Sequence, residues 1–416
     1  MRSLRYACRT LVGPWLVLPA AVLEAVNFAQ RGMPWRGEAL WTVDWFAIAL
    51  FIIGPLLAGA AAVDAARLSK PGNIHLVLAT RRPYRPYLRA AMWCAGPVLA
   101  VHLVTIATGL IVSRVHGSTP WLGIALAALV QGLAICWYTA IGSAIGRLAG
   151  PLVAGAVASL GAFALIYLLG EGGSDGFNLL ALGGATVSRL GYDYAPGYLA
   201  AQIVVFTLTA ALVLLLPLHQ RSGLRLPTPA GAPCVAIAAA LVTTGPYMLP
   251  DERFTADAAA PTDCTRTAPK VCLYPDHQRF RSQVVQHVQT LSQAADAAGY
   301  RSLVPQRFEE LSRTYRINAP NTIGMEIPAD AYATGEVSLE EVASAMVRPL
   351  HCDLMYTEPG PGPKYWEREF SLYATLLNTA GVKVREEEFP ASPRILSPQD
   401  VDKIMRDYGT CNLEGT

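Results

Sequence analysis

The chain has little charge, and least of all in its first 250 residues. Only 15% of its 416 residues are Asp, Glu, Lys or Arg, whereas 52% are hydrophobic. Charge is scarcest in seven apolar stretches of about 20 residues, a length that crosses a ~30 Å hydrocarbon core as a helix. Water-soluble domains do not repeat such stretches, which excludes an ordinary soluble protein for this part. The predicted spans are roughly 11–30, 44–63, 91–113, 121–145, 151–170, 198–218 and 232–250.

The chain also lacks the common catalytic and nucleotide-binding motifs. It contains no P-loop, no His-Glu-x-x-His, no Gly-x-Ser-x-Gly, and no Ser-x-x-Lys in a nucleophile setting. Because no loop is built to cradle phosphates, any ATP-driven step needs an ATPase on a separate chain. We therefore predict that the protein is not an enzyme and has no cofactor, no metal and no nucleic-acid partner. A membrane-bound hydrolase without a recognisable motif is an alternative.

Lys and Arg are unevenly distributed between the predicted loops. With the N-terminus in the cytoplasm, twelve lie on the cytoplasmic side and four on the other, and the cytoplasmic loops of membrane proteins carry the excess. Seven crossings then place residues 251–416 outside the cytoplasm of a multi-pass plasma-membrane protein. The first span is alternatively a signal peptide, because a basic start precedes it. Glu24 within that span and the lack of a small-x-small cleavage site argue against this alternative.

The polar region 251–416 holds four of the eight cysteines. An even number of cysteines outside the cytoplasm favours disulfides. The spacing of Cys264 and Cys272 is too wide for a zinc knuckle, and no His pair accompanies them. A short polar loop containing Pro269 allows these two to pair, which leaves Cys352 for Cys411. The crossed pair of Cys272 with Cys352 is the alternative.

The same region has the pattern of a small α-rich α+β domain. Apolar residues recur with helical period over 275–298, and Gly299 follows as a stop signal. Ser338 and Glu341 form a capping box that opens a helix ending at Leu350. Further helices are expected over 363–380 and after Ser397, and strands over 322–328 and 382–389. The fold class is thus a polytopic helical membrane domain, residues 1–250, followed by an extracytoplasmic α+β domain, residues 251–416.

Several polar side chains lie inside or near the predicted spans, including Glu24, His102, Gln131 and Asp44. A charge at the bilayer centre costs about 2.5–3.5 kcal/mol on insertion scales, so such groups face the bundle interior or a wet cavity. Glu24 is the strongest candidate for a substrate or gating contact, with a buried structural role as the alternative. Asp44 is close to the water interface, where it is expected to mark the start of its helix.

The loop between the second and third spans contains a short apolar segment and then a basic one. Gly72 is followed by Leu76 and Leu78, and then by Arg82 and Arg85. This pattern resembles the coupling loop of ABC-2 type permeases, the membrane subunits of one class of ABC transporter. The resemblance implies that residues 72–85 dock into a groove of a cytoplasmic ABC ATPase. The alternative is an ordinary basic loop that binds anionic lipid of the bilayer.

The resemblance covers about residues 1–220, where six spans with both ends inside reproduce the order of the family. It implies a homodimer, or a pair with a second permease subunit. The segment 264–277 is similar to one that follows the spans in actinobacterial ABC permease-like membrane proteins. The expected function is a permease subunit whose outer domain binds a substrate or an envelope partner. Because the seventh span and the outer domain depart from the family pattern, a membrane-anchored sensor or assembly protein on a permease-like scaffold is the alternative.

Overall fold

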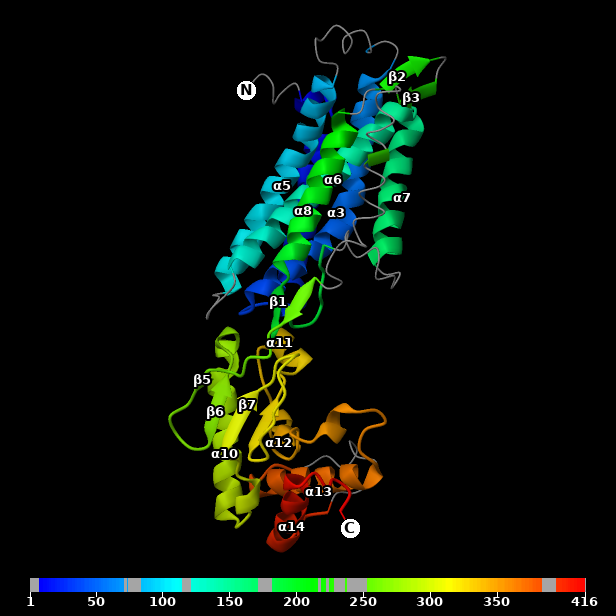
Figure 1. The fold of residues 1–416 in the computed structure, drawn as a ribbon. Coiled ribbons are helices and arrows are strands. Elements are labelled where there is room, and N and C mark those ends of the chain that lie inside the picture. The colour runs from blue at the N-terminus through cyan, green and yellow to red at the C-terminus, as the bar shows by residue number, and fades with distance from the viewer. Residues whose placement is uncertain are drawn as a thin grey trace.

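The computed structural model describes residues 7–70, 73, 84–113, 121–170, 182–215, 218–221, 224–227, 236–237, 253–383 and 394–415. A bundle of long helices occupies one end of the molecule, and a smaller sheet-containing part occupies the other (Figure 1). We call residues 253–415 the tail. The end of the bundle that meets the tail is the junction end, and the opposite end is the far end.

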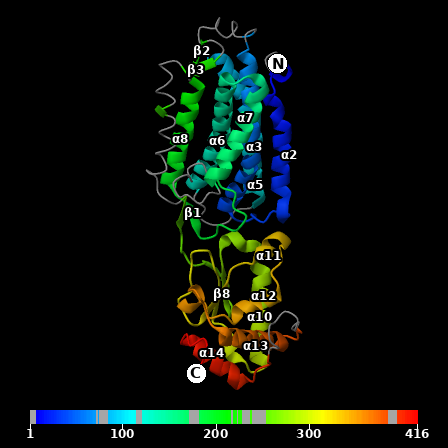
Figure 2. The same ribbon diagram turned by 90° about the vertical axis from the view of Figure 1, so that its right-hand side faces the viewer.

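The bundle contains four helices that are long and apolar enough to cross a membrane. They are α3 (Ala39–Leu68), α5 (Arg85–Ser113), α6 (Trp121–Leu148) and α8 (Pro196–Leu215). Two further helices, α2 (Val17–Ala29) and α7 (Pro151–Gly170), lie alongside them. Helix α3 is central, because it packs against α2, α5, α6 and α7 (Figure 2).

Seven spans are not supported. The first expected span is a short 3-10 helix, η1 (Gly13–Leu16), followed by α2 with only 13 residues. Helix α2 stops there because Arg31 and Met33 adopt left-handed backbone conformations. Helix α7, which matches the fifth span, has 20 residues, and its described side chains form an apolar helix over Val153–Leu165. The seventh, 232–250, lies outside the described residues apart from 236–237.

Glycines allow α6 to approach α3 closely. A Cβ atom at Gly142 would lie 2.1 Å from the carbonyl oxygen of Ala58, and one at Gly146 would lie 2.1 Å from that of Ala62. The four-residue spacing places both glycines on one face of α6, opposite two alanines with the same spacing on α3. Small residues at such contacts bring helix backbones together, which is a main source of helix association in membranes.

The tail is built on a four-stranded sheet with the order β5-β6-β7-β8. Strand β5 (Asp263–Cys264) pairs antiparallel with β6 (Lys270–Leu273). Strands β6, β7 (Arg307–Glu310) and β8 (Thr322–Met325) run parallel, which requires crossover connections. Helix α10 (Gln278–Ala297) lies within the first crossover. The tail also contains α11 (Ala329–Thr334), α12 (Leu339–Met346), α13 (Pro363–Thr379) and α14 (Pro398–Gly409).

These elements agree in kind with the α-rich α+β expectation. The capping box is present, because the Ser338 hydroxyl accepts from the Glu341 backbone N–H and the Glu341 carboxylate accepts from that of Ser338. The helix ends earlier than expected, at Met346, shortly before Pro349, which disfavours further helix. Strand β7 was not predicted from the sequence. Of the expected strand 382–389, only 382–383 are described, and they are not in a strand.

Both expected disulfides are confirmed. Cys264 bonds to Cys272 between the paired strands β5 and β6. Cys352 bonds to Cys411 and so ties the start of η7 (Asp353–Tyr356) to the chain just after α14. The second bridge closes 59 residues of sequence separation, so it anchors the end of the chain against the tail core.

Candidate functional site at the junction

A buried histidine lies between two carboxylates where the tail meets the bundle. His277 ends the short helix η5 (Pro275–His277), Glu310 ends β7, and Glu38 is the residue before α3. The His277 Nε2 atom is 2.9 Å from Glu38 Oε1, and its Nδ1 atom contacts Glu310 Oε1. All three side chains are buried, with at most 4% exposed. We call this group the junction triad.

The geometry of the junction triad determines its protonation state. When Glu38 and Glu310 are ionised, their oxygens only accept hydrogen bonds, so His277 donates from both ring nitrogens as an imidazolium. Burial lowers the pKa of His277, but Glu310 and Glu38 outweigh burial and raise that pKa to about 10. The two carboxylates therefore hold one positive charge between them at neutral pH, away from water.

Glu38 links three separate segments of the chain. Besides His277, it accepts a hydrogen bond from the Ser188 hydroxyl at 2.7 Å and from the Arg189 backbone N–H at 2.9 Å. Its own backbone carbonyl accepts from the N–H of Thr42 and so starts α3. A carboxylate at this end of a helix is favourable, because the helix dipole places partial positive charge there. Glu38 thus joins α3 to the loop 186–190 and to the tail.

A second buried ion pair lies beside the junction triad. Asp44 does not mark the start of α3, as its sequence position suggested, but lies in the second turn and is fully buried. Its Oδ1 atom is 3.0 Å from Arg253 Nη1, and its Oδ2 atom accepts from the Ala185 N–H at 3.0 Å. Arg253 directly precedes β4 (Phe254–Ala256), which pairs antiparallel with β1 (Tyr192–Tyr194). The first residues of the tail are therefore fixed to α3 as well.

Glycines permit close backbone contact across the junction. Gly32 and Gly37 have φ angles of 68° and 103°, a region that favours glycine. A Cβ atom on Gly37 would lie 2.0 Å from the carbonyl oxygen of Asp276, and one on Gly32 would lie 2.5 Å from that of Ala333. Any larger residue at these positions would push the tail away from the bundle.

A cleft of about 260 Å³ opens next to the junction triad. Both parts of the molecule line it. Trp41 of α3 and Val187 come from the bundle, and Ile327 and Tyr332 come from the tail. The rings of Trp41 and Tyr332 meet edge to face, with centroids 5.1 Å apart. Anything bound in this cleft would touch the bundle and the tail at once.

The structure brings the three predicted intramembrane residues together on different helices. The Glu24 Oε1 atom of α2 is 2.6 Å from His102 Nδ1 of α5, and His102 Nε2 is 2.9 Å from Gln131 Oε1 of α6. The Gln131 side-chain NH₂ donates to the Val43 carbonyl of α3 at 2.8 Å. All three side chains are buried.

This chain of hydrogen bonds limits where its protons can lie. The Val43 carbonyl only accepts, which turns the Gln131 oxygen toward His102 and requires a proton on Nε2. A single further proton lies between Glu24 and Nδ1. The group is then neutral overall, whether that proton sits on the carboxyl or on the imidazole. A neutral hydrogen-bonded group inside a membrane bundle avoids the cost of an isolated charge, and it ties four helices together.

The predicted ATPase-coupling residues lie mainly outside the described part of the chain. Gly72, Leu76, Leu78 and Arg82 are not described, and Arg85 begins α5. The helix ends on either side, the last turn of α3 and the first turn of α5, lie at the far end of the bundle (Figure 1). The coupling loop stays a prediction, and its two ends lie opposite the tail.

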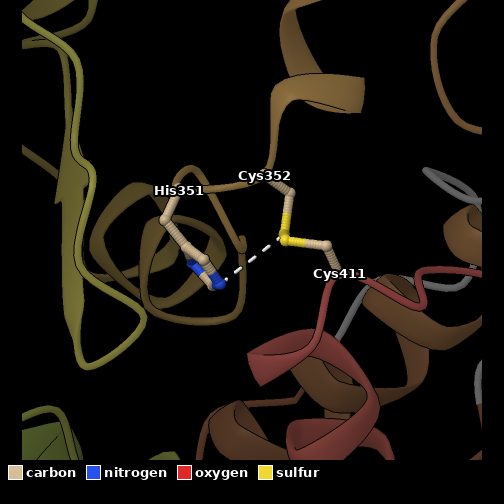
Figure 3. A group of neighbouring side chains, drawn as sticks. All are labelled: His351, Cys352 and Cys411. Carbon is tan, nitrogen blue, oxygen red and sulfur yellow. Dashed lines mark hydrogen bonds between the residues drawn. A yellow bond between two sulfur atoms is a disulfide. The ribbon is translucent and has the colours of Figure 1, made fainter.

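The tail also contains a cluster of His351, Cys352 and Cys411 (Figure 3). His351 Nε2 lies 3.6 Å from Cys352 Sγ, and burial lowers the pKa of His351, which favours the neutral imidazole. Both sulfur atoms are joined in a disulfide. Because zinc binds thiolates rather than disulfides, this cluster offers a metal only one ligand while the bond is intact.

The junction residues had not been singled out from the sequence. His277 ends the segment 264–277, whereas Glu38, Glu310 and Arg253 carry no motif. One signal was available, namely an acidic residue immediately before a long apolar span. Comparisons of the chain with family models, with curated proteins and with solved structures found no match. What the protein does is therefore inferred from the placement of its own residues.

Proposed function

We propose that the protein is the permease-like membrane subunit of an ABC-type transporter. Its tail lies outside the cytoplasm, and residues 72–85 dock a separate cytoplasmic ATPase. One observation carries this proposal, namely that α3 reaches both sites. Its first end is held by the tail through Glu38 and His277, and its last residue, Leu68, is followed within a few residues by Gly72.

Helix α3 is suited to transmit movement along this path. Its 30 residues, at 1.5 Å each, extend about 45 Å, which is the thickness of a bilayer with its headgroups. It is buried over most of its length, so it moves only with its neighbours. Near the far end, the Asp64 carboxylate accepts from the backbone N–H groups of Val12 and Gly13 at 2.8 and 2.9 Å. A shift of the tail would therefore reach the far end as one unit.

The distribution of charge and cysteines supports the orientation in this proposal. The basic segment 67–89 runs in sequence from the last turn of α3 to the first turns of α5, both at the far end, and cytoplasmic loops carry the Lys and Arg excess. Both disulfides lie in the tail, at the opposite end, and disulfides persist in oxidising compartments. The exposed apolar faces of the bundle suit a bilayer and a second permease subunit, either another copy or a homologous chain.

The test is a pull-down of the full chain from mild detergent, with the ATPase partner identified by mass spectrometry. Replacing Leu76 and Leu78 with Asp is expected to abolish ATPase recovery while membrane insertion continues. Leu148→Asp is the matched control, because Leu148 is an exposed leucine at the end of α6, outside the loop. Recovery of the ATPase with the double variant, or its absence with the unmodified chain, contradicts the coupling role.

The junction cleft also favours a second candidate, a membrane-anchored sensor on a permease-like scaffold. A ligand held by both parts would alter the tail–α3 contact without any transport. The same pull-down distinguishes the sensor from the transporter subunit. A regulator or an assembly partner in place of an ATPase supports the sensor.

A further inference from the structure

The rim of the junction cleft carries unpaired positive charge from both parts of the molecule. Arg31 comes from η2 (Gln30–Gly32) at the end of α2, and Arg313 comes from the loop after β7. Within the described chain, neither guanidinium has an ion-pair partner. Among the described residues of the lining, Glu326 is the only acidic one, so these residues carry a net positive charge. Guanidinium groups bind phosphate oxygens in pairs and with fixed geometry.

The walls of the cleft are mainly apolar and aromatic. Trp41, Leu190, Ile327 and Tyr332 line it, with Ser188 as a polar group. Its volume of about 260 Å³ is below the range usual for a drug-sized ligand. A site of this size holds a small polar headgroup and leaves the rest of a larger molecule outside.

Helix α2 has an exposed apolar face and ends shortly before Arg31, which lines the cleft. Leu18, Val22 and Val26 are four residues apart, so they share one face of α2, and each is about 60% exposed. Arg31 follows at the end of that helix in a left-handed conformation, with φ of 51°, which non-glycine residues rarely adopt and which recurs at functional sites. An amphiphile with its chain along α2 would bring its head to Arg31.

We propose that the junction cleft binds an anionic membrane lipid. The phosphate of the headgroup lies between Arg31 and Arg313, and the acyl chains lie along the exposed face of α2. The headgroup is then in contact with Ser188, whose hydroxyl also donates to Glu38 of the junction triad. The inference rests on the proposed function only in placing the cleft in the outer leaflet, and lipid binding can be measured without any ATPase.

The experiment titrates a short-chain phosphatidylglycerol into the purified full chain in neutral detergent, with tryptophan fluorescence as the readout. Parallel titrations use the matching phosphatidylcholine and inorganic phosphate. Phosphatidylglycerol is expected to bind, and each of Arg31→Gln and Arg313→Gln is expected to weaken it about tenfold, the effect of losing one charge-assisted contact. Arg316→Gln is the control, because this exposed arginine lies over the Tyr356 ring, outside the cleft lining.

Each outcome bears on the proposal. Equal binding of phosphatidylcholine overturns the anionic headgroup. Binding of inorganic phosphate with the affinity of the lipid overturns the lipid and indicates a phosphate site. Unchanged affinity in the double arginine variant overturns the site itself, provided that the junction is still closed. Closure is read from hydrogen exchange of the Asp257 N–H, which donates to the Gly191 carbonyl across the junction. Because the ATPase pull-down uses a different readout, loss of lipid binding and loss of the ATPase partner are told apart.

Discussion

The junction triad makes the attachment of the tail to α3 depend on pH. The pKa of His277 is raised to about 10 in the folded protein, above its ordinary value of about 6.5. The stabilisation from its positive charge is therefore complete below about pH 6.5 and is lost as pH rises through about 10. The pKa of the adjacent Asp276 is raised by burial to about 7. The cost of ionising Asp276 in the folded protein therefore grows from about pH 4 and is complete above about pH 7. The interval from about pH 7 to 10 isolates His277.

Two estimates of the stabilisation from the His277 charge agree in size. The shift of the His277 pKa, at 1.36 kcal/mol for each unit, corresponds to roughly 5 kcal/mol. Removal of one partner from a buried ion pair costs about 3–5 kcal/mol. His277→Gln is therefore expected to weaken the junction by about 3–5 kcal/mol at pH 7, which increases its opening constant by two to nearly four orders of magnitude.

Hydrogen–deuterium exchange measures this opening locally. The Asp257 N–H donates to the Gly191 carbonyl at 2.7 Å, and the Arg313 N–H donates to the Leu190 carbonyl at 3.2 Å. Both bonds cross from the tail to the bundle, so their protection reports whether the junction is closed. After correction for intrinsic exchange, protection of these amides is expected to fall between about pH 7 and 9 in the unmodified chain and to stay low in His277→Gln.

A matched control separates the junction from general destabilisation. His287 lies on α10 and is hydrogen-bonded to the Val337 carbonyl at 3.0 Å, away from the bundle. His287→Gln is expected to leave junction protection unchanged. The pH-dependent attachment is refuted if His277→Gln keeps unmodified protection at pH 7, or if protection in the unmodified chain does not change over the interval.

Two further predictions concern the bundle. Gly142→Ala places a methyl group against the Ala58 carbonyl and is expected to destabilise the bundle by about 1–3 kcal/mol, read as a lower thermal midpoint in detergent. Gly161→Ala is the control, because no atom lies within 4 Å of its added carbon, and it is expected to be neutral or slightly stabilising. An equal loss of stability in both variants contradicts close α3–α6 packing. Gln131→Leu leaves the His102 Nε2–H unpaired in the bundle, at a cost of about 1–2 kcal/mol, and an unchanged midpoint argues against the hydrogen-bonded chain.

The sequence predicted which kinds of structural element are present better than it predicted their number and pairing. Helical membrane segments, the capping box at Ser338 and the pairing of cysteines follow from local signals of hydrophobicity, capping and spacing. The number of spans did not follow, because hydropathy over 11–30 does not reveal that this stretch begins with the 3-10 helix η1 and becomes α2 only at Val17. Strand β7 has only four residues, and such a short strand is set by pairing within the sheet rather than by local pattern.

For the candidate sites too, the sequence predicted individual residues better than their contacts. Glu24, His102 and Gln131 were identified individually, because a polar group in an apolar span is conspicuous, but their mutual hydrogen bonds depend on helix packing. The junction triad was missed because Glu38 and His277 are separated by 239 residues in sequence. Glu38 and Glu310 look like ordinary acidic residues until the fold removes them from water and places one imidazole between them.

Each of the buried polar networks of the bundle and the junction described above includes a group on α3 or, at Glu38, on the residue before it. Glu38 receives the tail at its first end, Asp44 holds Arg253, and the Val43 carbonyl accepts from Gln131. Asp64 holds the backbone near the N-terminus at the far end. The side chains of α3 between these contacts are apolar and mostly small, and α6 approaches α3 closely there. A helix fixed by directional polar contacts at both ends and mostly buried between them is expected to transmit a displacement, because a packed interior transmits strain rather than absorbing it. The junction triad is the point where the tail can apply such a displacement, which is why its protonation and any ligand in the adjacent cleft are expected to act at the far end as well.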